Sequence, residues 1–293
     1  MEYTSPSTKT INEKEPKDER ALPSSLAQSI LDSSLISATK NSLYNAKIVQ
    51  CGNYIQVYYF ENRKKKPIVD DESELKLVKP NNGIKNIENK SVIRKDNITR
   101  SKLKCQRLAK CNNDLWKTFI TLTIAENITD INIANKYYKC FQEQVRRIYP
   151  NFRCIGVPEF QKRGAIHYHL LTNIDIDSEL IYIQEKNNRK YYHVKYWNKG
   201  FTKVDIVKGD IKKIIGYISK YMTKDVDNRL FSHHRYFYTR NLITPSISYI
   251  DTQNLQHISI LNKVFKDVEL IYKSDYVNSY NNEKILFCEY LKK

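Results

Sequence analysis

Residues 156–171 constrain the fold more than any other part of the chain, because they form two short runs around a tight turn. The turn contains a single glycine, Gly164, which follows two basic residues. A three-residue loop at 162–164, with Gly164 in the left-handed conformation, would pair Gln161 with Ala165. We therefore predict a β-hairpin with a defined register at this position.

The predicted hairpin brings three metal-binding side chains to one face. His167 and His169 are two residues apart on a strand, so both imidazoles point to the same side. The register places Glu159 opposite His167, on that same side. Two imidazoles and one carboxylate suit Mn²⁺ and, less ideally, Mg²⁺, with coordination positions open for phosphate and water. Two alternatives remain: surface or packing histidines, or the iron site of a non-haem oxygenase.

A second informative segment follows at 210–224, where Asp210 is expected to cap a helix of about 211–224. Tyr217 and Tyr221 are four residues apart and fall along one edge of this helix. Its apolar stripe is expected to pack on the sheet and consists of Ile211, Ile214, Ile215, Ile218 and Met222.

The two phenols suit nucleophilic attack on a phosphodiester. A free phenol ionises near pH ~10, so a metal and the neighbouring Lys220 and Lys224 would favour the phenolate and neutralise charge in the transition state. The product would be a phosphotyrosine and a free 3′-hydroxyl. The alternative interpretation is that Tyr217 and Tyr221 only flank a core.

The central part of the chain predicts an α+β fold. Apolar and β-branched runs alternate with two helical patterns in the order β-α-β-β-(β-β)-α, which is typical of a mixed sheet with helices on one face. The first helix is expected to start at Asp130 and to end at Pro150. The strands are predicted near 119–124, 152–160, 165–172, 191–196 and 201–207.

The flanking regions are less regular. A β-hairpin is predicted from 46–50 and 54–59, a polar loop or linker at 61–97, and a basic helix at 98–111 with Asn97 as its cap. Further strands are expected at 268–272 and 285–290. We expect four regions: a disordered or loosely attached tail at 1–40, a hairpin and basic helical region at 41–115, an enzymatic core at 116–245, and a C-terminal β extension of the same domain at 246–293.

The charge of the chain favours a nucleic-acid partner. Lys and Arg number 49 against 32 Asp and Glu, a formal net charge of +17, and 22 tyrosines offer rings on which bases of a single strand can stack. No signal peptide and no run of about 20 apolar residues is visible, so we expect a cytoplasmic protein with free thiols and no membrane partner. The candidate DNA contacts are Arg100, Lys102, Arg107, Lys162, Arg163, Arg235 and Arg240.

Three motifs in this order resemble those of replication initiators of the HUH endonuclease superfamily, named for two histidines separated by a hydrophobic residue. The first is the strand Phe119-Ile-Thr-Leu-Thr123, and the second is His167-Tyr-His169 with the upstream acid Glu159. The third is Tyr217-Ile-Ser-Lys220, which overlaps with Tyr221-Met-Thr-Lys224. The overlapping form is similar to initiators of small single-stranded DNA phages and related plasmids, and the basic aromatic segment 235–242 also resembles a segment found there.

The resemblance implies a ferredoxin-like or RRM-like antiparallel sheet with helices packed on it, extended here by N- and C-terminal β-hairpins. It also implies a metal-dependent endonuclease and strand transferase that nicks an origin hairpin for rolling-circle replication. Tyr217 would attack and keep the 5′ end, and Tyr221 or the same residue would later rejoin the strand. Many viral relatives carry a C-terminal helicase, but this chain has no Walker motif, so a host helicase and polymerase are the expected partners.

Two other functions fit the same residues. A relaxase or a transposase would use the same chemistry in conjugation or transposition. A non-catalytic module that binds single-stranded DNA or RNA on an RRM-like sheet would instead show exposed aromatic residues on its central strands.

Overall fold

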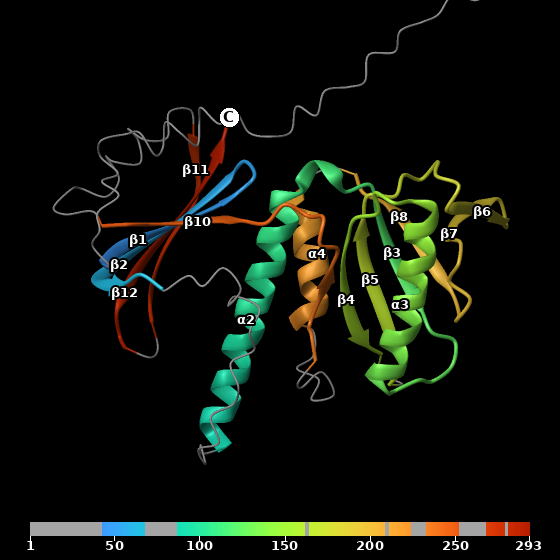
Figure 1. Ribbon diagram of the computed structural model, residues 1–293, viewed down its shortest axis with the longest axis horizontal. Coiled ribbons are helices and arrows are strands. Elements are labelled where there is room, and N and C mark those ends of the chain that lie inside the picture. Colours follow the sequence, from blue (N-terminus) through green and yellow to red (C-terminus); the bar gives the residue numbers. More distant parts are fainter. Residues whose placement is uncertain are drawn as a thin grey trace, which may run out of the picture.

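The computed structural model describes residues 43–67, 87–161, 164–208, 211–223, 233–251, 268–278 and 281–293. These residues form an α+β structure whose strands all pair antiparallel, in two five-stranded sheets and one two-stranded ribbon (Figure 1). Three α-helices accompany them within the described parts of the chain. None of these helices has the length and apolar character needed to cross a membrane.

The sheet that carries the candidate site has the strand order β8-β3-β5-β4-β9. Its central strands contain buried apolar and β-branched residues, as the predicted runs indicated, and they confirm the β-α-β-β order of the core. The bounds are β3 Thr118–Thr123, β4 Cys154–Phe160, β5 Ile166–Thr172, β8 Thr202–Ile206 and β9 Phe237–Tyr238.

Helix α3, Ile131–Ile148, covers one face of this sheet (Figure 1). The Asp130 carboxylate accepts a hydrogen bond from the backbone N–H of Asn132 and caps the helix, as predicted. Its apolar stripe packs on the buried strand residues, which include Leu122, Tyr168 and Leu170. The stripe consists of Ile131, Ala134, Tyr138, Phe141 and Val145.

Helix α4, Ile211–Thr223, lies against the opposite face of the sheet. Ile215, Ile218 and Met222 are buried there, which confirms the predicted apolar stripe for these residues. They pack on Ile155 and on other residues of β3, β4 and β5. Because the stripe fixes the rotation of α4, the tyrosine edge of the helix faces the predicted metal-binding strand.

The second large sheet has the order β10-β1-β2-β12-β11 and joins the two ends of the described chain. The predicted hairpin is confirmed, with Gly52 and Asn53 as a two-residue turn between paired Cys51 and Tyr54. The C-terminal strands were predicted in position but too short. The bounds are β1 Leu43–Cys51, β2 Tyr54–Lys65, β10 Ser246–Ile250, β11 Val268–Val277 and β12 Lys284–Lys292.

Helix α2, Ile87–Cys111, connects the two sheets and lies beside α4 (Figure 1). The prediction of a helix start at Asn97 was wrong, because the helix begins ten residues earlier. Residues 87–97 contain no Pro or Gly that would stop a helix. The region predicted as a linker at 61–97 is therefore partly strand β2 and partly helix α2.

Strands β6, Ile181–Lys186, and β7, Arg189–Val194, form the two-stranded ribbon, with left-handed Asn187 and Asn188 as its turn. Of these two strands, only β7 was predicted. Strands β9 and β10 were also missed, because each is short. The tail at 1–40 and the cap Asp210 lie outside the described residues.

Candidate active site

The hairpin of β4 and β5 has the predicted register. The backbone N–H of Gln161 donates to the Ala165 carbonyl at 2.8 Å, and Gly164 has a φ of 97°, in the region that favours glycine. Glu159 pairs with His167 across the two strands. This register is the reason that one carboxylate and two imidazoles meet on one face of the sheet.

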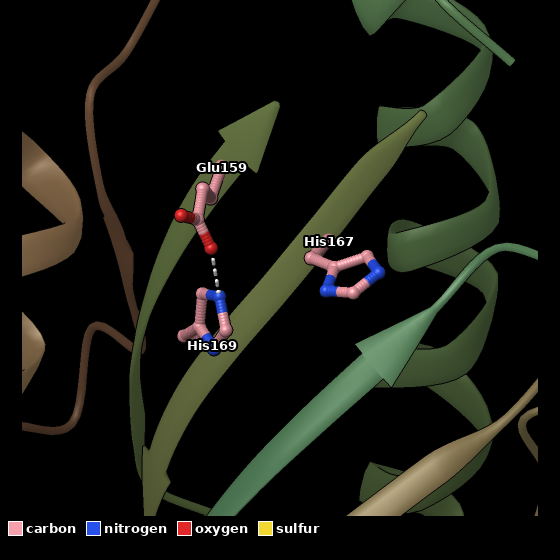
Figure 2. Close-up of side chains that lie close together, drawn as sticks. All are labelled: Glu159, His167 and His169. Atoms are coloured by element: carbon pink, nitrogen blue, oxygen red, sulfur yellow. Dashed lines mark hydrogen bonds and ion pairs between the residues drawn. The ribbon is translucent and has the colours of Figure 1, made fainter. Parts of the chain in front are cut away.

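Glu159, His167 and His169 form a group that can hold a metal ion. One ligand atom from each residue lies within 4.8 Å of the other two. Figure 2 shows both imidazoles on β5 and the carboxylate on β4, with Oε2 of Glu159 2.7 Å from Nε2 of His169. Atoms bound to one small divalent cation at about 2.1 Å lie at most about 4.2 Å apart. Small side-chain rotations would bring the three ligand atoms to that spacing, so the donor set fits Mn²⁺ or Mg²⁺.

Polar neighbours orient the two imidazoles. The Thr121 hydroxyl lies 3.3 Å from Nδ1 of His169, and the Gln161 amide nitrogen lies 3.5 Å from Nδ1 of His167. A partner on one ring nitrogen fixes the orientation of the ring and leaves the other nitrogen to act as a ligand. For His169, the nitrogen opposite Thr121 is the one that meets Glu159.

The two tyrosines of α4 lie directly over this group. The ring of Tyr221 stacks on the imidazole of His169, with 3.6 Å between centroids and 15° between planes. Tyr217 meets Tyr221 edge to face at 5.2 Å and meets Phe119 at 4.8 Å. Tyr217 is the more open of the two, with 46% of its surface exposed. A substrate therefore has freer access to the Tyr217 ring than to the Tyr221 ring.

The surroundings of Tyr221 keep its phenol protonated. Burial raises the pKa of Tyr221, and a hydrogen bond with Tyr217 and the negative charges of Tyr217, Glu159 and Asp205 raise it further. A protonated phenol is a hydrogen-bond donor. Tyr221 is thus placed to support its neighbour Tyr217 and the stacked imidazole.

Residues 117–226 match the family model of the replication-associated protein known as ORF2 or gene 2 protein. This segment is a replication-associated protein ORF2 domain. The match confirms the resemblance to rolling-circle replication initiators. The matched segment runs from β3 through α4, so it contains the three candidate ligands and both tyrosines. Comparisons with curated proteins and with solved structures gave no match.

Phe119 and Thr121 are the residues of the ORF2 domain whose place in the site was not predicted. Phe119 contacts the rings of Tyr217 and Tyr221 and stacks at 6.0 Å on His169. The two residues lie in the matched Phe-x-Thr strand motif, so the signal was in the sequence. Strand alternation puts them on the face that the histidines share.

The predicted DNA contacts do not gather in one place. Arg100 is exposed and Lys102 is partly exposed on α2, whereas Arg240 is exposed near β9. Arg235 is partly buried, and this burial lowers the pKa of its guanidinium. Lys220 lies exposed in the last turn of α4. Lys162, Arg163 and Lys224 lie outside the described residues.

Arg107 lies in the interior, between α2 and strand β2, and we withdraw it as a DNA contact. Its guanidinium donates to the Gln56 side-chain oxygen and to the Tyr58 hydroxyl, each at 2.8 Å. The Gln56 amide in turn donates to Glu289, which also pairs with Lys110. These residues form a polar network that joins α2 to the second sheet.

Proposed function

We propose that this chain is a replication initiator that nicks and rejoins single-stranded origin DNA of a plasmid or phage. One observation carries the proposal: the Tyr221 ring stacks on His169, a member of the Glu159, His167 and His169 group, within an ORF2 domain. A metal-binding group and a tyrosine pair in contact are what tyrosine-dependent cleavage of a phosphodiester needs.

A divalent cation, Mn²⁺ or Mg²⁺, held by Glu159, His167 and His169 would act as a Lewis acid toward the scissile phosphate. The Tyr217 oxygen attacks phosphorus, and a new O–P bond forms. The bond from phosphorus to the 3′ oxygen breaks, so the 5′ end remains on tyrosine. The proton lost from the phenol is balanced by the proton that the departing 3′ oxygen gains. The free 3′-hydroxyl is then available to prime synthesis by a host polymerase.

Tyr217 is our choice for the first attack, because its ring is more exposed and its oxygen is hydrogen-bonded to the Tyr221 hydroxyl. A donor to that oxygen favours the phenolate form. Tyr221, or Tyr217 again, would take part in the later rejoining step. Lys220 and Lys224, at the same end of the sequence motif, would balance phosphate charge.

The strand order β8-β3-β5-β4, with α3 on one face and α4 on the other, supports our proposal that the core has the ferredoxin-like HUH endonuclease fold. We also propose that 116–245 is the catalytic core. The region 41–115 and the C-terminal strands from 246–293 would be additions to it. A host helicase would supply strand separation.

The proposal is tested with labelled single-stranded oligonucleotides that cover both strands of the replicon encoding the chain. They are incubated with the protein and Mn²⁺ and analysed on a denaturing gel. We expect a covalent protein–DNA adduct on one origin-derived strand, lost with EDTA and in His167→Ala. His193→Ala, which changes a histidine of the ribbon, is the matched control and should keep the adduct. Absence of an adduct with the wild-type protein on every oligonucleotide would refute the enzyme.

A further inference from the structure

The face of the sheet that carries the histidines continues beyond α4 onto the edge strand β8. The backbone N–H of Thr123 donates to the Phe201 carbonyl at 2.8 Å, and Thr123 pairs with His167 on its other side. Lys203 pairs with Thr121, which in turn pairs with His169. Two rows of residues therefore run across the sheet from the edge strand to the candidate metal ligands.

Alternation along β8 sets which side chains share this face. Thr202 and Val204 are buried on the side of α3. Phe201 and Lys203 alternate with them, so they lie on the histidine side. Two strand spacings separate Phe201 from His167, a distance of roughly 10 Å. A nucleic-acid strand whose phosphate is at the metal group can reach Phe201.

Phe201 and Lys203 are open to solvent. Phe201 has 73% of its surface exposed, the largest fraction among the exposed large hydrophobic residues of the described chain. The Lys203 side chain is 71% exposed, and its ammonium is 2.8 Å from Asp205. An exposed phenylalanine gains little from burial, so the fold itself gives no reason for this ring.

The backbone around Phe201 is held firmly. Gly200 has a φ of 152°, and a Cβ there would lie 2.2 Å from the Thr123 carbonyl oxygen, so no other residue fits without a backbone shift. The same carbonyl accepts a hydrogen bond from the Trp197 indole at 2.9 Å. These contacts anchor the loop before β8, so the Phe201 ring is presented at a fixed position.

We propose that Phe201 is a stacking platform for one unpaired base of single-stranded DNA, beside the scissile phosphate, with Lys203 near the adjoining phosphate. A flat exposed ring next to a cation is the arrangement by which proteins bind single strands without reading their sequence. This inference rests on the proposed function, because it assigns a place to the DNA that the site would cleave. Phe201 is a positioning residue, and it takes no part in bond making.

The test measures binding separately from cleavage. Fluorescence anisotropy of a labelled oligo(dT) 20-mer is recorded with the full chain in EDTA, where no nick can form. We expect Phe201→Ala to weaken binding about tenfold and Phe201→Trp to restore it. Tyr272→Ala, which removes a 55% exposed ring on β11, is the matched control and should leave affinity unchanged.

A strand made only of abasic units separates stacking from charge. Wild type and Phe201→Ala should bind this strand equally, because it has no base to stack. Equal affinity of the two proteins for oligo(dT), while wild type still forms the covalent adduct, would overturn the platform and leave the proposed function intact. A tenfold loss for Phe201→Ala in a protein that forms no adduct would uphold the platform as a DNA contact and remove the nuclease.

Discussion

Tyr221 lies almost parallel to the imidazole of His169, with ring centroids 3.6 Å apart. The contact joins helix α4 to strand β5 at the candidate metal ligand. Tyr217, one helical turn earlier, is held against Tyr221 and Phe119 by edge-to-face contacts. The two phenols therefore have different surroundings although they occupy equivalent places in the repeated motif.

This difference predicts unequal effects of removing each hydroxyl. Tyr217→Phe should abolish the covalent DNA adduct, because it removes the proposed nucleophile. Tyr221→Phe should keep the adduct but form it more slowly, because the donor to the Tyr217 oxygen is lost. The measurement is the single-turnover rate of adduct formation on a denaturing gel. An adduct that persists in Tyr217→Phe and disappears in Tyr221→Phe would assign the first attack to Tyr221.

Thr121 should influence metal affinity without being a ligand. Its hydroxyl lies 3.3 Å from Nδ1 of His169 and helps to hold the ring. Removal of such an outer partner commonly lowers affinity by about 10- to 100-fold, so we expect Thr121→Val to bind Mn²⁺ about tenfold more weakly. Thr121→Ser keeps the hydroxyl and should bind normally. Calorimetric titration with Mn²⁺ checks this, and equal affinities for all three proteins would contradict it.

Arg107 should stabilise the fold and leave DNA binding unchanged. Arg107→Ala leaves the buried Gln56 and Tyr58 groups without their donor, and we expect it to lower the free energy of unfolding by about 2–4 kcal/mol. Urea denaturation measures this loss. Arg100→Ala, on an exposed position of the same helix, should cost little. If Arg107→Ala is as stable as wild type but binds oligo(dT) more weakly, the residue is a DNA contact after all.

Glu283 predicts a stability that depends on acid pH. Burial alone would raise the pKa of this carboxyl, but hydrogen bonds from Lys64, Asn281 and the Asn62 backbone outweigh it, and the pKa is lowered. A lowered folded-state pKa gives stability that is complete above the unfolded value, near ~4.3, and is lost as pH falls through the folded value. Glu283→Gln should lower stability at pH 7 by about 1–3 kcal/mol and flatten this acid-side loss. Urea midpoints from pH 3 to 7 test it, and parallel curves would refute it.

The parts of the site that the sequence predicted correctly depend on local rules. The register of β4 and β5 follows from the turn, because Gly164 alone among the neighbouring residues suits a left-handed position. The rotation of α4 follows from the spacing of Ile215, Ile218 and Met222. With both known, the approach of the tyrosine edge to the histidine strand needs only the packing of α4 on that face.

The parts that were missed depend on partners far away in the chain. Arg107 looked like a surface cation in a basic helix, since the acceptor on Gln56 that holds it is 51 residues away. The start of α2 was placed too late, because residues 87–97 have no apolar stripe to announce a helix. Phe201 was passed over because exposure of a single residue before a strand cannot be read from periodicity.

The pairing of β2 with β12 also determines the order in which the molecule can form. Hydrogen bonds between Gln56 and Glu289 join residues 233 positions apart, whereas β3, β4, β5 and α4 lie within one continuous segment. During synthesis, the segment with the tyrosines and the metal ligands leaves the ribosome while β12 is still untranslated. Contacts of such high sequence separation form slowly. The half-built sheet of β1 and β2 thus waits with an open strand edge, and a chaperone that covers it would guard the nascent chain against aggregation.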